Sequence, residues 1–232
     1  MKEKNIIQYY YNQLASEYDN DRFNNTYGQY LHSQETQILK RDLKGISKDL
    51  ILDMGCGTGR FLEFANHGVD FSEGMLQLAK KKFPDRQLKV GDIRQLPFER
   101  DTFDAIYSLH VFMHLDMATV KAAIQEAHRV LKPNGILIFD FPSKARRQLI
   151  NYKKEGWHGN TALDVEMIQS LSQGLFEVKR YEGVLFFPIH RIPVSLRSYF
   201  IKLDSWLGKT FLKKWASYHF VYLSKITRNT TF

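Results

Sequence analysis

A glycine-rich turn directly after a short apolar run is the feature that most constrains this chain. Residues 50–52 (LIL) are apolar, as in a strand buried on both faces of a sheet, and residues 53–60 read DMGCGTGR. Glycine tolerates positive φ and lets a ligand approach the backbone closely. A helix predicted over residues 61–65 would add the unpaired N–H groups of its first turn. The pattern predicts a turn that binds a nucleotide-like ligand at the end of a strand.

Strand and helix patterns alternate along the rest of the chain. The apolar spacing predicts further strands at residues 69–71, 88–90, 103–108, 135–141, 176–184 and 218–223. Helices are predicted at residues 7–18, 30–43, 72–82, 119–131 and 164–173, with Ser72 as an N-cap and Gly45 as a C-cap. An insertion over residues 187–214 precedes the last strand. This alternation predicts an α/β fold with a doubly wound, Rossmann-like sheet and right-handed crossovers.

Composition excludes several classes of protein. No apolar run approaches the roughly 20 residues that span a bilayer. The N-terminus has no apolar core followed by small residues, so we expect no secretory signal. Cys56 is the only cysteine, which excludes an internal disulfide and a Cys-rich metal site. These features predict a cytoplasmic protein without a metal site.

The net charge of +8 is unevenly distributed along the chain. Residues 1–142 hold 18 Lys and Arg against 19 Asp and Glu, whereas residues 143–232 hold 15 against 6. A basic C-terminal third attracts phosphate, nucleic acid or an anionic membrane, or it is a solvated face that keeps the protein soluble. The charge pattern alone leaves these interpretations open.

Acidic residues follow three successive predicted strands. Asp53, Asp70 and Asp92 each come at a strand end, on the edge where open α/β sheets bind ligands. The glycines are spaced G-x-G-x-G, and Arg60 stands where a dinucleotide-binding turn would have its third glycine. Asp53 would also repel a pyrophosphate. The combination disfavours a nicotinamide-dependent oxidoreductase, which would share the fold class.

Four stretches resemble the class I S-adenosylmethionine-dependent methyltransferases, in particular the branch of small-molecule and quinone-type enzymes. The stretches are ILDMGCGTGR, GVDFSEGMLQLAKKK, GDIRQLPFERDTFDAIYSLHVFMHL and EAHRVLKPNGILIFDFPS, and they cover residues 50–143 almost continuously. The resemblance implies a seven-stranded sheet of order 3-2-1-4-5-7-6 with strand 7 antiparallel. It also implies S-adenosyl-L-methionine as the cofactor.

The same resemblance implies roles for individual residues at the cofactor. Those expected at its methionine end are Asp53, Gly55, Gly57 and Gly59. Those expected at its ribose and adenine are Asp70, Phe71, Met75, Asp92 and the backbone of Ile93. Those expected near its sulfonium are Ser108 and His110. Core packing is an alternative explanation for Phe71 and Met75.

The N-terminal region is expected to cover the cofactor. Tyr11, Tyr18 and Arg22 resemble a motif that closes over it in the family. Residues 1–45 would then be a helical cap on a methyltransferase domain of residues 46–232. For the two tyrosines, a helix face packed on the domain is an equal alternative. The connection from Gly59 to Asp70 is short, with ten residues between them, so the first helix must be short or the second strand nearly vestigial.

Methyl transfer by in-line displacement requires proximity, alignment and the exclusion of water. A general base is needed only if the accepting atom carries a proton at the working pH. His110 and His114, just past the fourth strand, are the candidate bases, and a structural role is the favoured alternative for His114. The expected acceptor is a small molecule.

The insertion over residues 187–214 mixes aromatic and basic side chains. Its apolar residues at helical spacing are Leu196, Phe200, Leu203, Leu207 and Phe211. The segment is either a helix packed on the domain or a lid for an amphiphilic or anionic acceptor, presented at an anionic membrane surface. Three basic residues after the fifth strand would contact a phosphate or carboxylate, namely Lys144, Arg146 and Arg147.

Two further functions share features with this chain. A nucleic-acid methyltransferase would use the basic C-terminal third, but residues 108–111 read SLHV in place of an Asn/Asp-Pro-Pro-Tyr/Phe motif. No RNA-binding module is recognisable either, so a nucleic-acid partner is not expected. A non-catalytic binding protein with this fold is the second alternative. The sequence makes no prediction of the oligomeric state.

Overall fold

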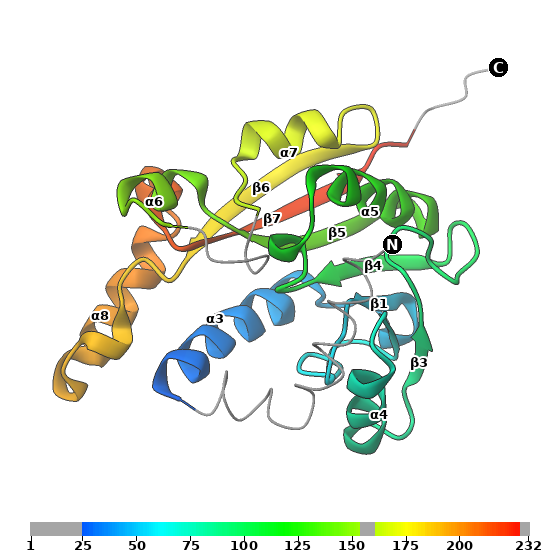
Figure 1. The fold of residues 1–232 in the computed structure, drawn as a ribbon, viewed down its shortest axis with the longest axis horizontal. Coiled ribbons are helices and arrows are strands. Elements are labelled where there is room, and N and C mark those ends of the chain that lie inside the picture. The colour runs from blue at the N-terminus through cyan, green and yellow to red at the C-terminus, as the bar shows by residue number, and fades with distance from the viewer. Residues whose placement is uncertain (1–24, 154–160, 228–232) are drawn as a thin grey trace.

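The computed structural model of this chain describes residues 25–153 and 161–227, which form one seven-stranded sheet with helices on both faces (Figure 1). The strands are β1 (Ile51–Met54), β2 (His67–Asp70), β3 (Gln87–Val90), β4 (Phe103–Ser108), β5 (Leu131–Pro142), β6 (Phe176–Val184) and β7 (Tyr218–Lys225). Their order is β3-β2-β1-β4-β5-β7-β6. Strands β1 to β5 are parallel, and β7 is antiparallel to both β5 and β6. The predicted fold class, strand order and direction of strand 7 are confirmed.

Local sequence explains where the helices begin. The helices are α3 (Thr26–Asp42), α4 (Glu73–Lys82), α5 (Met117–Val130), α6 (Lys144–Leu149), α7 (Val165–Leu171) and α8 (Val194–Leu207). The described part of the chain also contains four short 3-10 helices, η1 (Lys48–Leu50), η2 (Phe112–His114), η3 (Ile189–Arg191) and η4 (Phe211–Trp215). The side chains of Ser72, Asp116, Ser143 and Asp164 each accept a hydrogen bond from a backbone N–H of the first turn that follows, which otherwise lacks a partner.

Most predicted helices in the described part of the chain are confirmed, with ends that shift by a few residues. Helix α6 was not predicted, although Ser143 provides an N-cap signal. Gly45 adopts φ +87° in the turn after α3, three residues past the end of that helix. The helix predicted over residues 7–18 lies outside the described residues.

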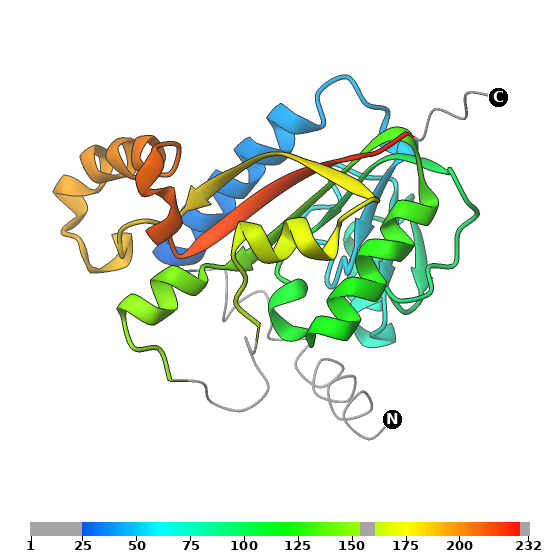
Figure 2. The same ribbon diagram turned by 90° about the horizontal axis from the view of Figure 1, so that it is seen from above.

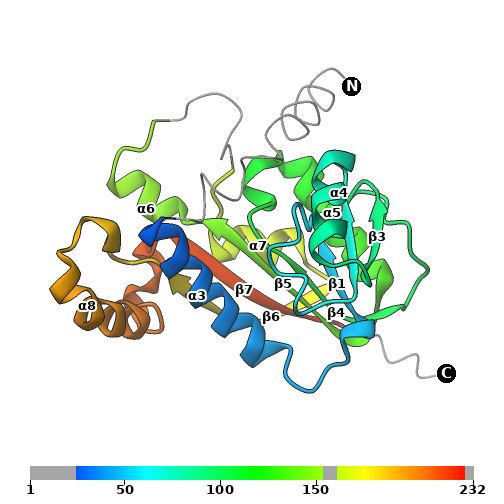
Figure 3. The ribbon, with the colours of Figure 1, turned by 90° about the horizontal axis from the view of Figure 1, so that it is seen from below.

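Different helices cover the two faces of the sheet (Figures 2 and 3). Each face buries its own hydrophobic core. Helices α5 and α7 cover one face, where Ile124 and Ile168 are fully buried against Leu137 and Phe139. Helix α3 crosses the other face, where Leu39 is fully buried against Tyr107. Each helix packs one apolar stripe onto the pleated surface and leaves its other side to solvent.

The helix predicted over residues 61–65 is wrong. Residues 55–66, which join β1 to β2, form successive turns held by hydrogen bonds from Leu62 N to Gly59 O and from Phe64 N to Phe61 O. A parallel crossover usually takes a dozen or more residues and includes a helix. Here the connection uses its residues to bury Leu62 and Ala65 and to return to β2, so no helix forms.

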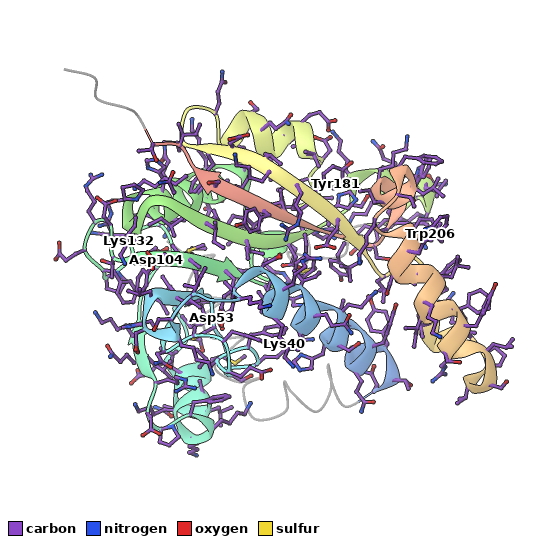
Figure 4. The ribbon with its side chains drawn as sticks, turned by 180° about the vertical axis from the view of Figure 1, so that it is seen from behind. Lys40, Asp53, Asp104, Lys132, Tyr181 and Trp206 are labelled. Carbon is purple, nitrogen blue, oxygen red and sulfur yellow. The ribbon has the colours of Figure 1, made fainter. Side chains whose placement is uncertain are left out.

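The insertion between β6 and β7 contains η3, α8 and η4 and extends from one end of the sheet (Figures 1 and 3). Trp206 on α8 lies at the opposite end of the molecule from Asp104 and Lys132, which lie near the starts of β4 and β5 (Figure 4). The insertion therefore lies toward the carboxyl ends of these two strands. Across residues 25–153 and 161–227, no helix is long and apolar enough to cross a membrane.

Candidate active site

Three glycines give the turn after β1 its shape. Gly55, Gly57 and Gly59 have φ values of +85°, +50° and +84°, in the left-handed region that favours glycine. A Cβ added to Gly55 would lie 2.4 Å from Cγ2 of Val111, whereas no atom of the described residues comes within 4 Å of a Cβ added to Gly57. The turn therefore leaves the backbone of Gly57 accessible to a ligand.

Two buried carboxylates meet at this turn. The Asp70 carboxylate, at the end of β2, accepts hydrogen bonds from Gly57 N at 2.8 Å and Ser72 N at 2.9 Å. Burial raises the pKa of Asp70 to about 6, although these backbone hydrogen bonds oppose the shift. Burial also raises the pKa of Asp53 well above its usual range, against a hydrogen bond from Tyr107, and the Asp70 charge adds to the rise. The structure thus brings two of the three predicted acids together.

The third predicted acid lies in a different environment. The Asp92 carboxylate follows β3 and binds the guanidinium of Arg94 at 2.7 Å and the Arg94 backbone N–H at 2.9 Å. Ile93 packs against the core beneath α5. Met75, in the first turn of α4, is 2% exposed, and Phe71 is half-buried directly after Asp70. These residues line the same sheet edge, but Asp92 is held by its own turn.

Ser108 and His114 both lie at the carboxyl end of β4. The Ser108 hydroxyl is fully buried and donates a hydrogen bond to the carbonyl of Met54 at 2.6 Å, which ties β4 to β1. His114 ends η2. Tyr11, Tyr18 and Arg22 lie outside the described residues, so the predicted closure over the cofactor remains a prediction.

His110 belongs to a cluster of four charged residues whose meeting was not predicted. Its ring Nε2 lies 2.5 Å from Oε1 of Glu35, and the other oxygen of Glu35 binds the Arg60 guanidinium at 2.6 Å. On the other side, Asp140 Oδ1 accepts the His110 backbone N–H at 2.6 Å, and Oδ2 lies 3.7 Å from the ring Nδ1. Helix α3, the turn after β1, the loop after β4 and strand β5 each contribute one residue.

The two carboxylates of the cluster are buried, and the side chains of His110 and Arg60 are partly exposed. Glu35 is 0% exposed and Asp140 is 1% exposed. Burial lowers the pKa of His110, but the charges of Glu35 and Asp140 outweigh burial, so its pKa lies above the ordinary value. Burial raises the pKa of Asp140, and the charge of His110 opposes that rise. Oδ2 of Asp140 is buried and has no hydrogen-bond partner among the described residues, and such an atom needs a donor.

Weak signals for the two carboxylates of this cluster exist in the sequence. Tyr27, Leu31, Glu35 and Leu39 are spaced by four residues, so Glu35 lies on the buried stripe of α3. Asp140 interrupts the apolar strand GILIFDF. An acid on a buried face is expensive unless it is paired, and so it marks a site.

Aromatic side chains border the cluster. Tyr218 begins β7, and its ring centroid lies 6.0 Å from that of His110 in an edge-on arrangement. The Tyr27 side chain on α3 hydrogen-bonds to Tyr218, and burial raises the pKa of both phenols. Both phenols therefore stay protonated at neutral pH and offer polar groups inside an apolar wall.

The three basic residues of α6 differ in their surroundings. Lys144 forms an ion pair with Asp164 at 3.0 Å. Arg146 is half-buried, and its backbone N–H is capped by Ser143. The Arg147 guanidinium lies 4.5 Å from the centre of the Tyr152 ring, and burial lowers its pKa. Interactions with Tyr152 and Tyr218 oppose that shift, which relates Arg147 to the aromatic side chains that border the cluster.

Comparison with known proteins identifies the family. The methyltransferase domain family matches residues 52–139. An uncharacterized protein of Methanocaldococcus jannaschii is 30% identical over 94% of this chain and 90% of its own length. A demethylmenaquinone methyltransferase of Streptomyces avermitilis is 40% identical over a match that covers 39% of this chain and 42% of that relative. This chain belongs to the class I S-adenosylmethionine-dependent methyltransferases.

Solved structures show the same fold. A methyltransferase of Thermotoga maritima, described as a possible histamine N-methyltransferase, superimposes with a TM-score of 0.66. It is 20% identical and covers 93% of this chain and 98% of its own. At that identity the likeness establishes the fold alone.

The residues at the glycine turn fit S-adenosylmethionine, the cofactor of this family. The open space beside Gly57 allows close approach to the backbone. The Asp70 carboxylate accepts backbone N–H groups of Gly57, Ser72 and Phe71, and its two oxygens keep the capacity to accept a further donor, such as a ribose hydroxyl. Asp53 supplies a second buried carboxylate beside the turn, which suits the ammonium group of a methionine moiety.

Proposed function

We propose that this methyltransferase transfers a methyl group to a small-molecule acceptor. The atom that receives the methyl group is an oxygen or nitrogen that carries a proton. The observation that carries the proposal is the charged cluster around His110, in which a buried oxygen of Asp140 has no hydrogen-bond partner among the described residues. A small acceptor with a hydrogen-bond donor would satisfy that oxygen. A polymer would require a site that opens widely to solvent, whereas α3 crosses this edge with Glu35 fully buried.

The cofactor end of the site is assigned to the glycine turn and the strand ends. When bound, S-adenosylmethionine supplies a methyl group on a positively charged sulfur. We assign its methionine end to Asp53, Gly55, Gly57 and Gly59, its ribose to Asp70 and its adenine to Asp92, Ile93, Phe71 and Met75. His110 follows β4 at the same edge and is assigned to the acceptor side.

His110 is the candidate proton acceptor. A neutral imidazole takes the proton that the acceptor atom loses as its lone pair forms the new bond to carbon. Glu35 and Asp140 stabilise the resulting imidazolium, because both carboxylates face its ring nitrogens. They act as positioning residues through His110. His114, which ends η2, is assigned a structural role.

In-line displacement depends on alignment and on the exclusion of water. The site supplies both through packing. Helix α3 buries Tyr30, Leu31 and Leu39 against the sheet, and Tyr218 closes the side next to His110. The backbone of His110 is held at φ +60°, a left-handed conformation that a non-glycine residue adopts at some cost and that often marks a functional site.

Transfer of a labelled methyl group tests the proposal. The protein would be incubated with methyl-labelled S-adenosylmethionine and cell extract separated into aqueous small-molecule, organic-soluble and macromolecular fractions. We expect label in one of the two small-molecule fractions and none with Asp70→Ala. Label confined to the macromolecular fraction would refute a small acceptor. Tight cofactor binding without transfer to any fraction would indicate a non-catalytic binding protein.

A further inference from the structure

Helix α8 presents aromatic and basic side chains on one outward face. Tyr199, Lys202 and Trp206 are spaced by three and four residues, so they lie on the same side of the helix. Tyr199 is 69% exposed and Trp206 is 61% exposed. Lys209 and Phe211 follow directly, and Phe211 is 81% exposed. We refer to these five exposed residues, three on α8 and two in the segment that follows it, as the aromatic–basic face.

The opposite side of α8 provides the packing that the fold requires. Phe200 and Ile201 pack against the core beneath α3. Asp204 is 1% exposed and accepts hydrogen bonds from Tyr30 Oη, Gln34 Nε2 and Phe187 N. The helix is therefore anchored without the aromatic–basic face. Its exposed aromatic rings require another explanation, since large exposed apolar patches usually mark interaction sites.

The acidic side chain and the exposed basic side chains of the insertion point to opposite sides. Residues 187–214 contain six Lys and Arg and a single acid, Asp204. That acid points inward and is satisfied by three donors. Lys202 and Lys209 are exposed. The outer surface of the insertion is consequently cationic and complements an anionic partner.

A second apolar patch lies at the same end of the molecule. Leu149, Ile150 and Tyr152 at the end of α6 are 63%, 54% and 46% exposed. Helices α6 and α8 lie at this end in each of three views (Figures 1, 2 and 3). Both therefore border the edge of the sheet where β4 and β5 end.

We propose that the aromatic–basic face docks on the anionic surface of a lipid bilayer. Tyr and Trp have an apolar ring and a polar tip and favour the level of the lipid headgroups. Lysine stems lie along the apolar boundary while their ammonium groups bind headgroup phosphates. A protein partner fits less well, because lysine is depleted at protein–protein interfaces. The patch at the end of α6 extends the contact.

Vesicle flotation with the full chain tests the docking, and it does not depend on methyl transfer. The vesicles are phosphatidylcholine alone or phosphatidylcholine with phosphatidylglycerol, at low and high salt. We compare the unmodified chain with a Lys202→Glu/Lys209→Glu variant and a Tyr199→Ser/Trp206→Ser variant. A Lys81→Glu/Lys121→Glu variant makes the same charge change at exposed positions of α4 and α5, away from α8. Circular dichroism confirms that each variant is folded.

The expected result is flotation with anionic vesicles at low salt and release at high salt. A juxtamembrane lysine contributes roughly fivefold in affinity, so Lys202→Glu/Lys209→Glu should weaken binding by at least about tenfold while the Lys81→Glu/Lys121→Glu control binds normally. The proposal is overturned if the unmodified chain does not bind anionic vesicles, or if the two lysine variants bind equally. It is also overturned if the chain ignores vesicles and forms a dimer that Tyr199→Ser/Trp206→Ser dissociates, which would assign the face to a second copy.

Discussion

The ring Nε2 of His110 lies 2.5 Å from Oε1 of Glu35, which joins the loop after β4 to a helix that precedes the whole sheet in sequence. The contact is buried, and the second oxygen of Glu35 binds Arg60 in the turn after β1. A single carboxylate thus connects the turn assigned to the cofactor with the histidine proposed to face the acceptor. Its removal should affect the site's acid–base behaviour before it affects cofactor binding.

Replacing Glu35 with Gln should move the pH dependence of methyl transfer toward acid. His110 must be neutral to take a proton, and the Glu35 and Asp140 charges hold its pKa above the ordinary value. Activity should therefore rise as pH increases through that raised pKa. Removing one charge lowers the pKa, so the acid limb of kcat shifts to lower pH. The pH profile of kcat measures this shift, and NMR titration of the His110 ring assigns it.

The same substitution should also cost stability. It leaves Arg60 partly buried without its charged partner, which should lower the free energy of unfolding by about 3 kcal/mol. Glu166→Gln, at an exposed position of α7, is the matched control and should leave both the profile and the stability unchanged. An unchanged pH profile in a folded Glu35→Gln protein would remove His110 from the proposed role.

Gly57 and Gly59 should respond differently to replacement with Ala. The space beside Gly57 is open, so the added methyl group costs about 1–2 kcal/mol through its left-handed φ alone. The added methyl group would also fill the space through which the cofactor approaches the backbone. We therefore expect binding of S-adenosylhomocysteine to weaken by at least tenfold. At Gly59 a Cβ would meet Leu62 Cδ1 at 3.0 Å and Ala79 Cβ at 3.2 Å, which adds steric strain to the same backbone cost. We expect a loss of about 3 kcal/mol in unfolding free energy.

Calorimetric titration and thermal unfolding separate these two effects. Gly57→Ala should remain close to the unmodified protein in Tm and lose affinity. Gly59→Ala should lose Tm by a clearly larger amount. The opposite ranking in Tm would contradict the steric difference between the two sites, and an unchanged affinity in Gly57→Ala would show that the cofactor does not approach beside Gly57.

The affinity for S-adenosylhomocysteine should depend on pH through Asp70. Burial raises the pKa of Asp70 to about 6, so the carboxylate is ionised above that pH and protonated below it. The ionised form accepts hydroxyl donors better, and binding therefore favours the deprotonated state. Affinity should be constant well above pH 6 and fall by up to about tenfold per unit below it. Titration calorimetry measures the slope, and Asp70→Asn should abolish it. A slope that persists in Asp70→Asn belongs to another group.

Replacing Asp204 with Ala should release α8 while the cofactor site remains intact. The substitution leaves Tyr30 Oη, Gln34 Nε2 and Phe187 N without their acceptor, at about 3 kcal/mol. Hydrogen exchange of residues 194–207 should accelerate, and the affinity for S-adenosylhomocysteine should not change. Asp85→Ala, at an exposed position, is the control. Equal exchange in both variants would mean that α8 is held by its apolar contacts alone.

The sheet and the glycine turn were predictable because each has a strong local signal. Buried parallel strands are apolar runs that end in a turn, and Ser72 marks the start of α4 by its residue type and position alone. The order of the strands came from resemblance to a family and not from periodicity. A helix was predicted between β1 and β2, but none forms there. Its absence could not be predicted, because the space between the strands decides whether a helix fits.

The charged cluster was less accessible to sequence reasoning. His110 was selected because it follows a strand end, but its partners are distant in sequence, with Glu35 seventy-five positions before it and Asp140 thirty after it. Each partner looks like an isolated exception within an apolar stripe. Only the fold brings α3 across the edge of β4 and β5. There Glu35 and Asp140 both lie beside the ring of His110.

The absence of a helix in residues 55–66 changes the source of positive charge beside the glycine turn. In an ordinary βαβ unit, the helix that follows such a turn contributes about half an elementary charge, spread over several backbone N–H groups. Here the positive charge that directly follows the turn is the guanidinium of Arg60. A helix dipole is retained after almost any side-chain substitution, whereas a single substitution removes the charge of a side chain. The positive charge beside this turn, which Glu35 binds, is therefore open to loss by mutation in a way that the dipole of a helix is not.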